Sequence, residues 1–389
     1  MSAAKEDIKH YLALLDRGVE RRGTKSAKWD GDNTHNIIFA MGCADTDFEV
    51  PPAVKEAMLK RVEHGAFGYT MVGDDDLDAV VYWMSRRRGM EIKREWVTFS
   101  PGVIDSLNVA VGAFTKPGDT IAIFTPVYGP FFGVVEGNGR KLYECPLKND
   151  GNGWTMDLNK LEDGFRSGAK MLLLCSPHNP IGRVWREEEL RELHELCERY
   201  GVIVASDEIH ADTIMPGYKH TPWIKIDPNG MTMMSATKAF NIAALRCSSA
   251  IIPNDEIRTK FRKEFESRKI NGINLFGVLA QSTCYTEGYD WLDAFCLYID
   301  GNRQLAEEYI GAHRPEFKLS RIEGTYLLWI DMHALNLEQK ELCEWCYARG
   351  LGLVSGTGFG EMAGTGYMRM NLATPRRNVQ KALELFCAK

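Results

Sequence analysis

The chain contains 389 residues, which at roughly 100–200 residues per domain predicts two or three domains, and 44% of them are apolar, enough to fill a large core. This composition excludes a disordered chain and a small disulfide-stapled fold. The 47 Lys and Arg residues against 53 Asp and Glu residues leave a net charge of -6, and the densest basic run is only residues 86–88, so we expect no nucleic-acid surface.

Three features of the sequence bear on location and chemistry. The ten cysteines are scattered, and the Cys343-x-x-Cys346 pair has no second pair to complete a metal site, so we expect reduced thiols, a cytoplasmic protein and no metal. No apolar stretch approaches the roughly 18 residues of a membrane span, so we expect no membrane segment. Glycine is enriched, with 36 residues, which indicates the tight backbone turns that phosphate-binding enzymes need.

The predicted elements begin with an amphipathic helix over residues 5–22, where apolar residues recur at spacings of three and four. Strands and helices then alternate. The predicted strands are Val97–Phe99, Thr120–Phe124, Lys141–Cys145, Met171–Cys175, Val202–Ser206, Met231–Ser235 and Cys247–Ile252. The predicted helices between them include Ile104–Thr115, Asp157–Arg166 and Arg186–Arg199. This alternation predicts an α/β fold with a mostly parallel seven-stranded sheet covered by helices on both faces.

The pattern changes after Pro253 to long helical stretches and then to a mixed tail. The glycine-rich segment 355–366 is interpreted as the turn that enters a last strand, Tyr367–Leu372. We therefore expect an N-terminal helix and arm over residues 1–48, a large domain over 49–285, and a smaller α+β domain over 286–389 against which the arm packs.

Polar residues and glycines follow successive predicted strands. Gly102 opens a turn before a helix, where free N–H groups suit an anion, and Tyr128 follows the next strand. Asn179 follows a third predicted strand and precedes a candidate cis proline. Asp207 follows a fourth, and its carboxylate requires a cation. Lys238 follows a fifth predicted strand. Loss of solvation there would lower the pKa of its amine, and the neutral amine is a nucleophile for an aldehyde. Each feature alone also fits an ordinary structural role, but parallel strands bring all five to one crevice.

The ordered set resembles pyridoxal-phosphate (PLP) enzymes of fold type I, the class I/II aminotransferase superfamily, and within them the cystathionine β-lyase branch of MalY-like and PatB-like proteins and cystalysin. The resemblance spans almost the whole chain. Its motifs are Lys28-Trp29-Asp30, Ala44-Asp45-Thr46-Asp47-Phe48, Phe67-Gly68-Tyr69-Thr70, Pro126-Val127-Tyr128-Gly129-Pro130-Phe131-Phe132, Cys175-Ser176-Pro177-His178-Asn179-Pro180, Ser206-Asp207-Glu208-Ile209-His210, Lys238-Ala239-Phe240-Asn241-Ile242-Ala243, Glu323-Gly324-Thr325-Tyr326 and Arg369-Met370-Asn371-Leu372-Ala373-Thr374-Pro375.

The resemblance implies a role for each matching position. Lys238 would be the Schiff-base lysine and proton shuttle, and Asp207 would pair with the cofactor's pyridine nitrogen. Tyr128 would stack on the ring and Asn179 would bond its phenolic oxygen, near the substrate. His210 stands where many aminotransferases carry Tyr, and would support Asp207 or the ring oxygen.

The resemblance also implies how phosphate and substrate are bound. The backbone of Gly102, Val103 and Ile104, with Ser235 and Arg246, would cradle the phosphate. Tyr69 would reach the phosphate of a neighbouring subunit and border the substrate, which implies a homodimer with shared active sites. Arg369 would clamp the substrate α-carboxylate.

The implied activity is carbon–sulfur β-elimination from L-cystathionine or a related cysteine derivative, giving a thiol such as homocysteine, pyruvate and ammonia. Methionine biosynthesis is the expected pathway, with cysteine desulfuration and conjugate detoxification left open. An aminotransferase shares every cofactor contact and is the alternative. A regulatory protein-binding role is a further hypothesis, as a second function.

Overall fold

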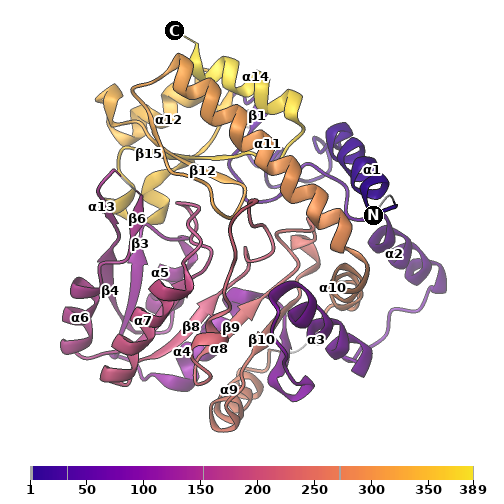
Figure 1. Ribbon diagram of the computed structural model, residues 1–389, viewed down its shortest axis with the longest axis vertical. Helices are drawn as coiled ribbons and strands as arrows, with labels where there is room; N and C mark the ends of the chain where they lie inside the picture. The colour runs from indigo at the N-terminus through magenta and orange to yellow at the C-terminus, as the bar shows by residue number, and fades with distance from the viewer. Residues whose placement is uncertain (1–2, 33, 152, 271–272, 389) are drawn as a thin grey trace.

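The computed structural model describes residues 3–32, 34–151, 153–270 and 273–388. At its centre lies a seven-stranded sheet, which Figure 1 shows with helices packed around it. In spatial order its strands are β2 (Val97–Ser100), β10 (Ser248–Ile251), β9 (Met231–Met234), β8 (Ile203–Asp207), β7 (Ala169–Cys175), β3 (Thr120–Thr125) and β4 (Lys141–Pro146). Among these seven only β10 is antiparallel to its neighbours, so the predicted mostly parallel seven-stranded sheet is confirmed.

Side chains of each strand point alternately to the two faces of this sheet, and both faces are covered by hydrophobic clusters. In β3, Ala122 and Phe124 belong to one hydrophobic cluster, whereas Ile121 and Ile123 belong to another on the opposite face. The first cluster includes α6 (Leu158–Arg166) and α7 (Glu187–Tyr200), and the second includes α4 (Val103–Phe114), α5 (Pro130–Gly137) and α9 (Asp255–Ser267). This double burial explains why inner strands such as β7 and β9 are continuous apolar runs in the sequence, whereas the edge strand β4 is mostly not buried.

A smaller four-stranded sheet is formed by the C-terminal part of the chain. Its strands, in spatial order, are β11 (Lys318–Leu319), β12 (Leu327–Asp331), β15 (Tyr367–Asn371) and β14 (Val354–Ser355). The glycine-rich segment forms η4 (Gly356–Phe359) and α13 (Glu361–Gly364) directly before β15, as predicted. The helices of this part are α11 (Tyr289–His313), α12 (Gln339–Tyr347) and α14 (Arg376–Cys387), with η3 (His333–Leu335).

Short elements complete the description. The remaining helices are α2 (Pro52–His64), α3 (Asp74–Arg88), α8 (Trp223–Ile226) and α10 (Leu275–Glu287), with η1 (Arg94–Trp96) and η2 (Ala243–Leu245). The remaining strands pair as β1 (Phe39–Ala40) with β13 (Leu351–Gly352), and β5 (Lys148–Asn149) with β6 (Trp154–Thr155). Within the described ranges, no helix is both long and apolar enough to cross a membrane.

The N-terminal helix ends earlier than predicted. Helix α1 covers Ala3–Arg17, not residues 5–22, because Gly18 takes a left-handed φ of +60° and closes the helix by donating to Leu15 O. A β-carbon on Gly18 would lie 2.2 Å from Pro375 Cγ, so the chain turns close against the C-terminal part. Val19 then donates to Asp47 O at 3.0 Å, which directs the following residues along the N-terminal arm.

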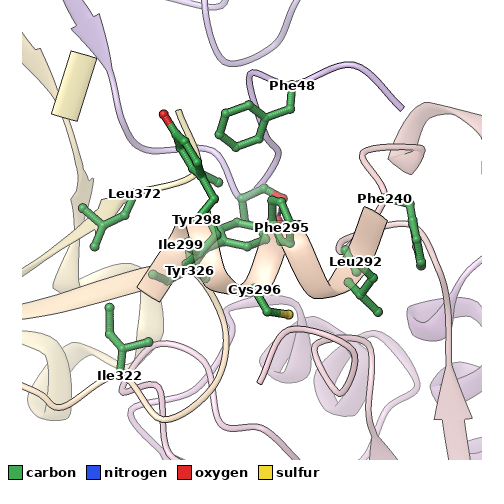
Figure 2. Close-up of a cluster of buried hydrophobic side chains, with 14 of the residues drawn as sticks. Phe48, Phe240, Leu292, Phe295, Cys296, Tyr298, Ile299, Ile322, Tyr326 and Leu372 are labelled. Atoms are coloured by element: carbon green, nitrogen blue, oxygen red, sulfur yellow. Dashed lines mark hydrogen bonds between the residues drawn. The ribbon is translucent and has the colours of Figure 1, made fainter. Parts of the chain in front are cut away.

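An aromatic cluster joins the arm to helix α11 (Figure 2). Phe48 makes edge contacts with Phe295 and Tyr298, at centroid distances of 6.0 and 5.5 Å, and Phe295 makes one with Tyr326 at 6.2 Å. Helix α11 also packs against α1 and α14, as Figure 1 shows. The arm is therefore fixed between α11 and the C-terminal part, while the domain boundaries at residues 48 and 285 stay a prediction.

Candidate active site

One pocket of about 270 Å³ lies at the carboxyl ends of the parallel strands. It gathers ten of the residues singled out from the sequence, which come from six separate strand ends and turns. These are Gly102, Val103, Ile104, Tyr128, Asn179, Asp207, His210, Ser235, Lys238 and Arg246. The order of the parallel strands thus brings together residues spread over 145 positions of sequence, from 102 to 246.

A larger cavity of about 510 Å³ lies elsewhere, beside Arg87, Arg88 and His220. Its two arginines already have anionic partners, since Arg87 pairs with Asp293 and Arg88 with Asp212. We therefore place the chemistry in the smaller pocket, where the buried Asp207 and Lys238 form no ion pair with any described residue.

Asp207 ends β8 and its side chain is 3% exposed. Its carboxylate accepts a hydrogen bond from the Ile209 backbone N–H at 3.0 Å, and it forms no ion pair within the part of the chain that the structure describes. Burial raises the pKa of this carboxyl to about 6. A cationic ring nitrogen placed beside it would restore the ionised form.

Lys238 follows β9 and faces the same pocket. Its Nζ donates a hydrogen bond to the Ala44 carbonyl oxygen at 2.9 Å. Burial lowers the pKa of this amine, which increases the neutral fraction that can attack a carbonyl carbon. The contact with Ala44 was not foreseen from the sequence, because it joins positions 194 residues apart.

Arg369 lies on β15 of the small sheet and is not among the residues that line the pocket, but it contacts Asn179, which lines it. Its Nη1 donates to Asn179 Oδ1 at 3.1 Å and its Nη2 donates to the Gly42 carbonyl at 2.8 Å. The residue is 4% exposed, its Nε has no partner, and no described carboxylate pairs with it. Burial lowers the pKa of the guanidinium to about 10, so it remains charged at neutral pH and suits an incoming carboxylate.

Tyr128 and His210 complete the ring-sized part of the pocket. The Tyr128 backbone N–H donates to the Asn179 carbonyl at 3.1 Å, and the Asn179–Pro180 bond is cis as expected. Burial raises the pKa of the Tyr128 hydroxyl, which therefore stays protonated. His210 is buried, and burial lowers its pKa well below the usual value, so the imidazole is neutral. Its Nδ1 has no hydrogen-bond partner among the described residues and could therefore bind a ligand.

The other end of the pocket suits an anion. Helix α4 begins at Val103, so the first N–H groups of this helix, including those of Val103 and Ile104, have no intrahelical acceptor. Ser235 lies nearby, and its Oγ donates to Cys247 O at 2.6 Å. Arg246 is largely exposed and pairs with Asp105 at 3.1 Å, an acid that sequence reasoning missed.

Tyr69 is not brought to this pocket by its own chain. Its side chain is fully exposed in the loop between α2 and α3, beside exposed Phe67 and Met71. The predicted contact of Tyr69 with a neighbouring subunit stays a prediction. Thr237, which the sequence did not single out, also lines the pocket, and its N–H donates to Ser235 Oγ at 3.1 Å.

Comparisons with known proteins identify the family of the chain. The model of the aminotransferase class I and II family matches residues 36–386, and the chain belongs to this family. It is similar to cystathionine β-lyase PatB of Bacillus subtilis (38% identical, covering 95% of this chain and 97% of PatB) and to protein MalY of Escherichia coli (32%, covering 94% and 95%). Among solved structures, PLP-containing cystalysin from Treponema denticola superposes with a TM-score of 0.91 at 35% identity, covering 95% of this chain and 96% of cystalysin.

The residues present fit pyridoxal phosphate. The pocket offers a buried unpaired carboxylate for a ring nitrogen, a desolvated amine for an aldehyde, and free helix N–H groups for a phosphate. The unpartnered His210 Nδ1 and the Arg369 Nε add two buried donors or acceptors without a protein partner. Among the described residues, no cluster of His, Cys, Asp and Glu could hold a metal ion.

Proposed function

We propose that this chain is a PLP-dependent carbon–sulfur β-lyase that converts L-cystathionine or a related cysteine derivative to a thiol, pyruvate and ammonia. One observation carries the proposal: the unpaired buried Arg369 guanidinium and the desolvated Lys238 amine contact the same short loop, through Gly42 O and Ala44 O. An amino acid can therefore bind its carboxylate at Arg369 with its Cα near Lys238. The similarity to PatB, whose name is cystathionine β-lyase, supports the lyase over other reactions.

When bound, PLP supplies an aldehyde that condenses with amines and a ring that withdraws electrons from Cα. The chain's residues direct this chemistry. Asp207 keeps the ring nitrogen protonated, and Asn179 and Tyr128 position the ring. The Lys238 amine removes the Cα proton, a step that contributes roughly 10²–10⁴-fold. Lys238 Nζ or the protonated Tyr128 hydroxyl then donates a proton to the departing sulfur.

An aminotransferase would use the same residues but would need a keto acid to complete its cycle. We expect the protein to release pyruvate and homocysteine in equal amounts from L-cystathionine when no keto acid is added. The measurement is a coupled lactate dehydrogenase assay with thiol detection. Turnover that depends strictly on an added keto acid would contradict the lyase and favour the aminotransferase.

The setting of the enzyme is also part of the proposal. We infer a homodimer in which Tyr69 reaches the partner's phosphate site, and the exposed apolar side chains of Phe67, Tyr69 and Met71 support it. A cytoplasmic location, a place in methionine biosynthesis, and the absence of nucleic-acid or membrane partners are proposed with it. The regulatory protein-binding role stays a prediction.

A further inference from the structure

The segment Gly42–Phe48, here called the carbonyl loop, touches both functional cations. Five consecutive carbonyl oxygens, 42 to 46, each accept a hydrogen bond from a side chain. Gly42 O accepts from Arg369, and Ala44 O accepts from Lys238 and from Tyr326 at 3.0 Å. Asn371 donates to Cys43 O and Asp45 O at 2.6 and 2.7 Å, and Thr46 O accepts from Arg21 and Asn241 at 2.9 and 3.0 Å.

This pattern couples the two sheets at the site. Lys238 and Asn241 follow the large sheet, whereas Arg369 and Asn371 lie on β15 of the small sheet. Because one backbone accepts from all four, a shift of the carbonyl loop moves the acceptors of Lys238 and Arg369 together. The geometry of both side chains therefore depends on what fixes this loop.

A buried charged cluster fixes the end of the loop at Asp47. Lys28, whose side chain is fully buried, donates from Nζ to Asp47 Oδ2 at 2.9 Å. Trp29 donates from its indole Nε1 to Asp47 Oδ1 at 2.8 Å, and Arg21 lies 3.5 Å from the same oxygen. The backbone of Asp47 is also held, since its N–H donates to Ala373 O at 3.0 Å.

Asp30 stabilises the turn that precedes Lys28 and Trp29. Its carboxylate accepts from the backbone N–H groups of Gly23 and Ser26, both at 2.9 Å. These hydrogen bonds lower the pKa of the Asp30 carboxyl, so it stays ionised. All three residues of the Lys28-Trp29-Asp30 motif thus act on Asp47, directly or through the turn, and none of them reaches the pocket.

We propose that Lys28, Trp29 and Asp47 form a remote anchor that positions the Lys238 amine and the Arg369 guanidinium through the backbone of the carbonyl loop. The proposal deepens the proposed function and rests on it. Without the anchor, the carbonyl loop loses its buried side-chain contacts at the Asp47 carboxylate and keeps those to Asn371, Asn241 and Ala373, so we expect the acceptors of both cations to shift together. Substrate binding at Arg369 and proton transfer by Lys238 should then weaken together, as expected when both side chains are positioned by one element.

The test uses Lys28→Met in the PLP-loaded protein. The probe is 3-(methylsulfanyl)propanoate, which has a carboxylate and a thioether but no amine, so it reports on Arg369 without reacting at Lys238. By titration calorimetry we expect its Kd to rise about 10-fold, with a fall in kcat for cystathionine of similar size. Because Kd is measured without turnover, a protein that proved not to be a lyase would still report on the anchor.

Trp29→Phe is the second variant, since Lys28→Met leaves a buried charge that can prevent folding. Trp29→Phe removes the indole hydrogen bond to Asp47 Oδ1 and leaves an aromatic ring at this position. Trp154→Phe is its matched control, because the Trp154 indole N–H also donates to a side chain, Ser320 Oγ at 2.7 Å, away from the loop. Changes of more than about threefold in both Kd and kcat for Trp29→Phe, with Trp154→Phe at wild-type values, support the anchor. Smaller changes in either constant, in protein that folds, would overturn it.

Discussion

Replacing Lys238 by Ala is expected to abolish both turnover and covalent attachment of the cofactor. Lys238 supplies the only amine among the described residues that line the pocket, and we propose that its Nζ acts as nucleophile and as base for the Cα proton. The loss of these roles should lower kcat/KM at least about 10⁴-fold. The measurement is steady-state pyruvate release together with the visible absorption spectrum of the purified protein.

Lys219→Ala provides the matched control for this change. Lys219 is an exposed lysine that lines the other, larger cavity, so its loss should leave both the spectrum and the rate unchanged. A Lys238→Ala protein that kept the wild-type visible band and measurable turnover would show that another residue carries the cofactor.

Replacing Asp207 by Asn is expected to lower kcat roughly 10²–10³-fold, because the shape is kept while the charge facing the ring nitrogen is lost. Cofactor binding should weaken as well, measured by equilibrium dialysis of the visible chromophore. Asp227→Asn is a suitable control, since Asp227 is also a buried acid with a raised pKa but lies outside the pocket. A kcat within threefold of wild type for Asp207→Asn would contradict the assignment.

The same substitution has a predictable effect on the stability of the cofactor-free protein. The pKa of Asp207 is raised from 3.8 to about 6 on folding, so the folded chain binds the proton more tightly than the unfolded chain. The wild type therefore loses stability as pH rises from 3.8 to 6, by roughly 2–3 kcal/mol in all. Asp207→Asn should be more stable than wild type by about that amount above pH 6, with the difference vanishing below pH 3.8, measured by urea unfolding.

Much of this arrangement could be predicted from the sequence because the central sheet is parallel. Its strands are apolar on both sides and stop at polar residues, so runs such as Met171–Cys175 mark both the strand and the position of the site beyond it. Asp207 and Lys238 stand out in the sequence for the same reason, because a charged group directly after a buried strand is costly unless a partner compensates it.

Other features depend on contacts that no local pattern records. The sequence of the carbonyl loop has no hydrophobic periodicity. Its proposed role rests on two long-range hydrogen bonds, from Lys238 to Ala44 O and from Arg369 to Gly42 O. Asp105, which pairs with Arg246, sits in an ordinary helix first turn. The apolar spacing of residues 5–22 continues past the true end of α1, because Val19 fits the stripe although Gly18 has already closed the helix.

We propose that PLP is bound covalently at Lys238, in the pocket at the carboxyl ends of the parallel strands. The most direct measurement is borohydride reduction of the purified, PLP-loaded protein, followed by proteolysis and mass spectrometry of the peptides. We expect one pyridoxyl-phosphate group per chain, on the peptide that contains Lys238. A label on any other lysine, or no label in a protein with a visible chromophore, would contradict it.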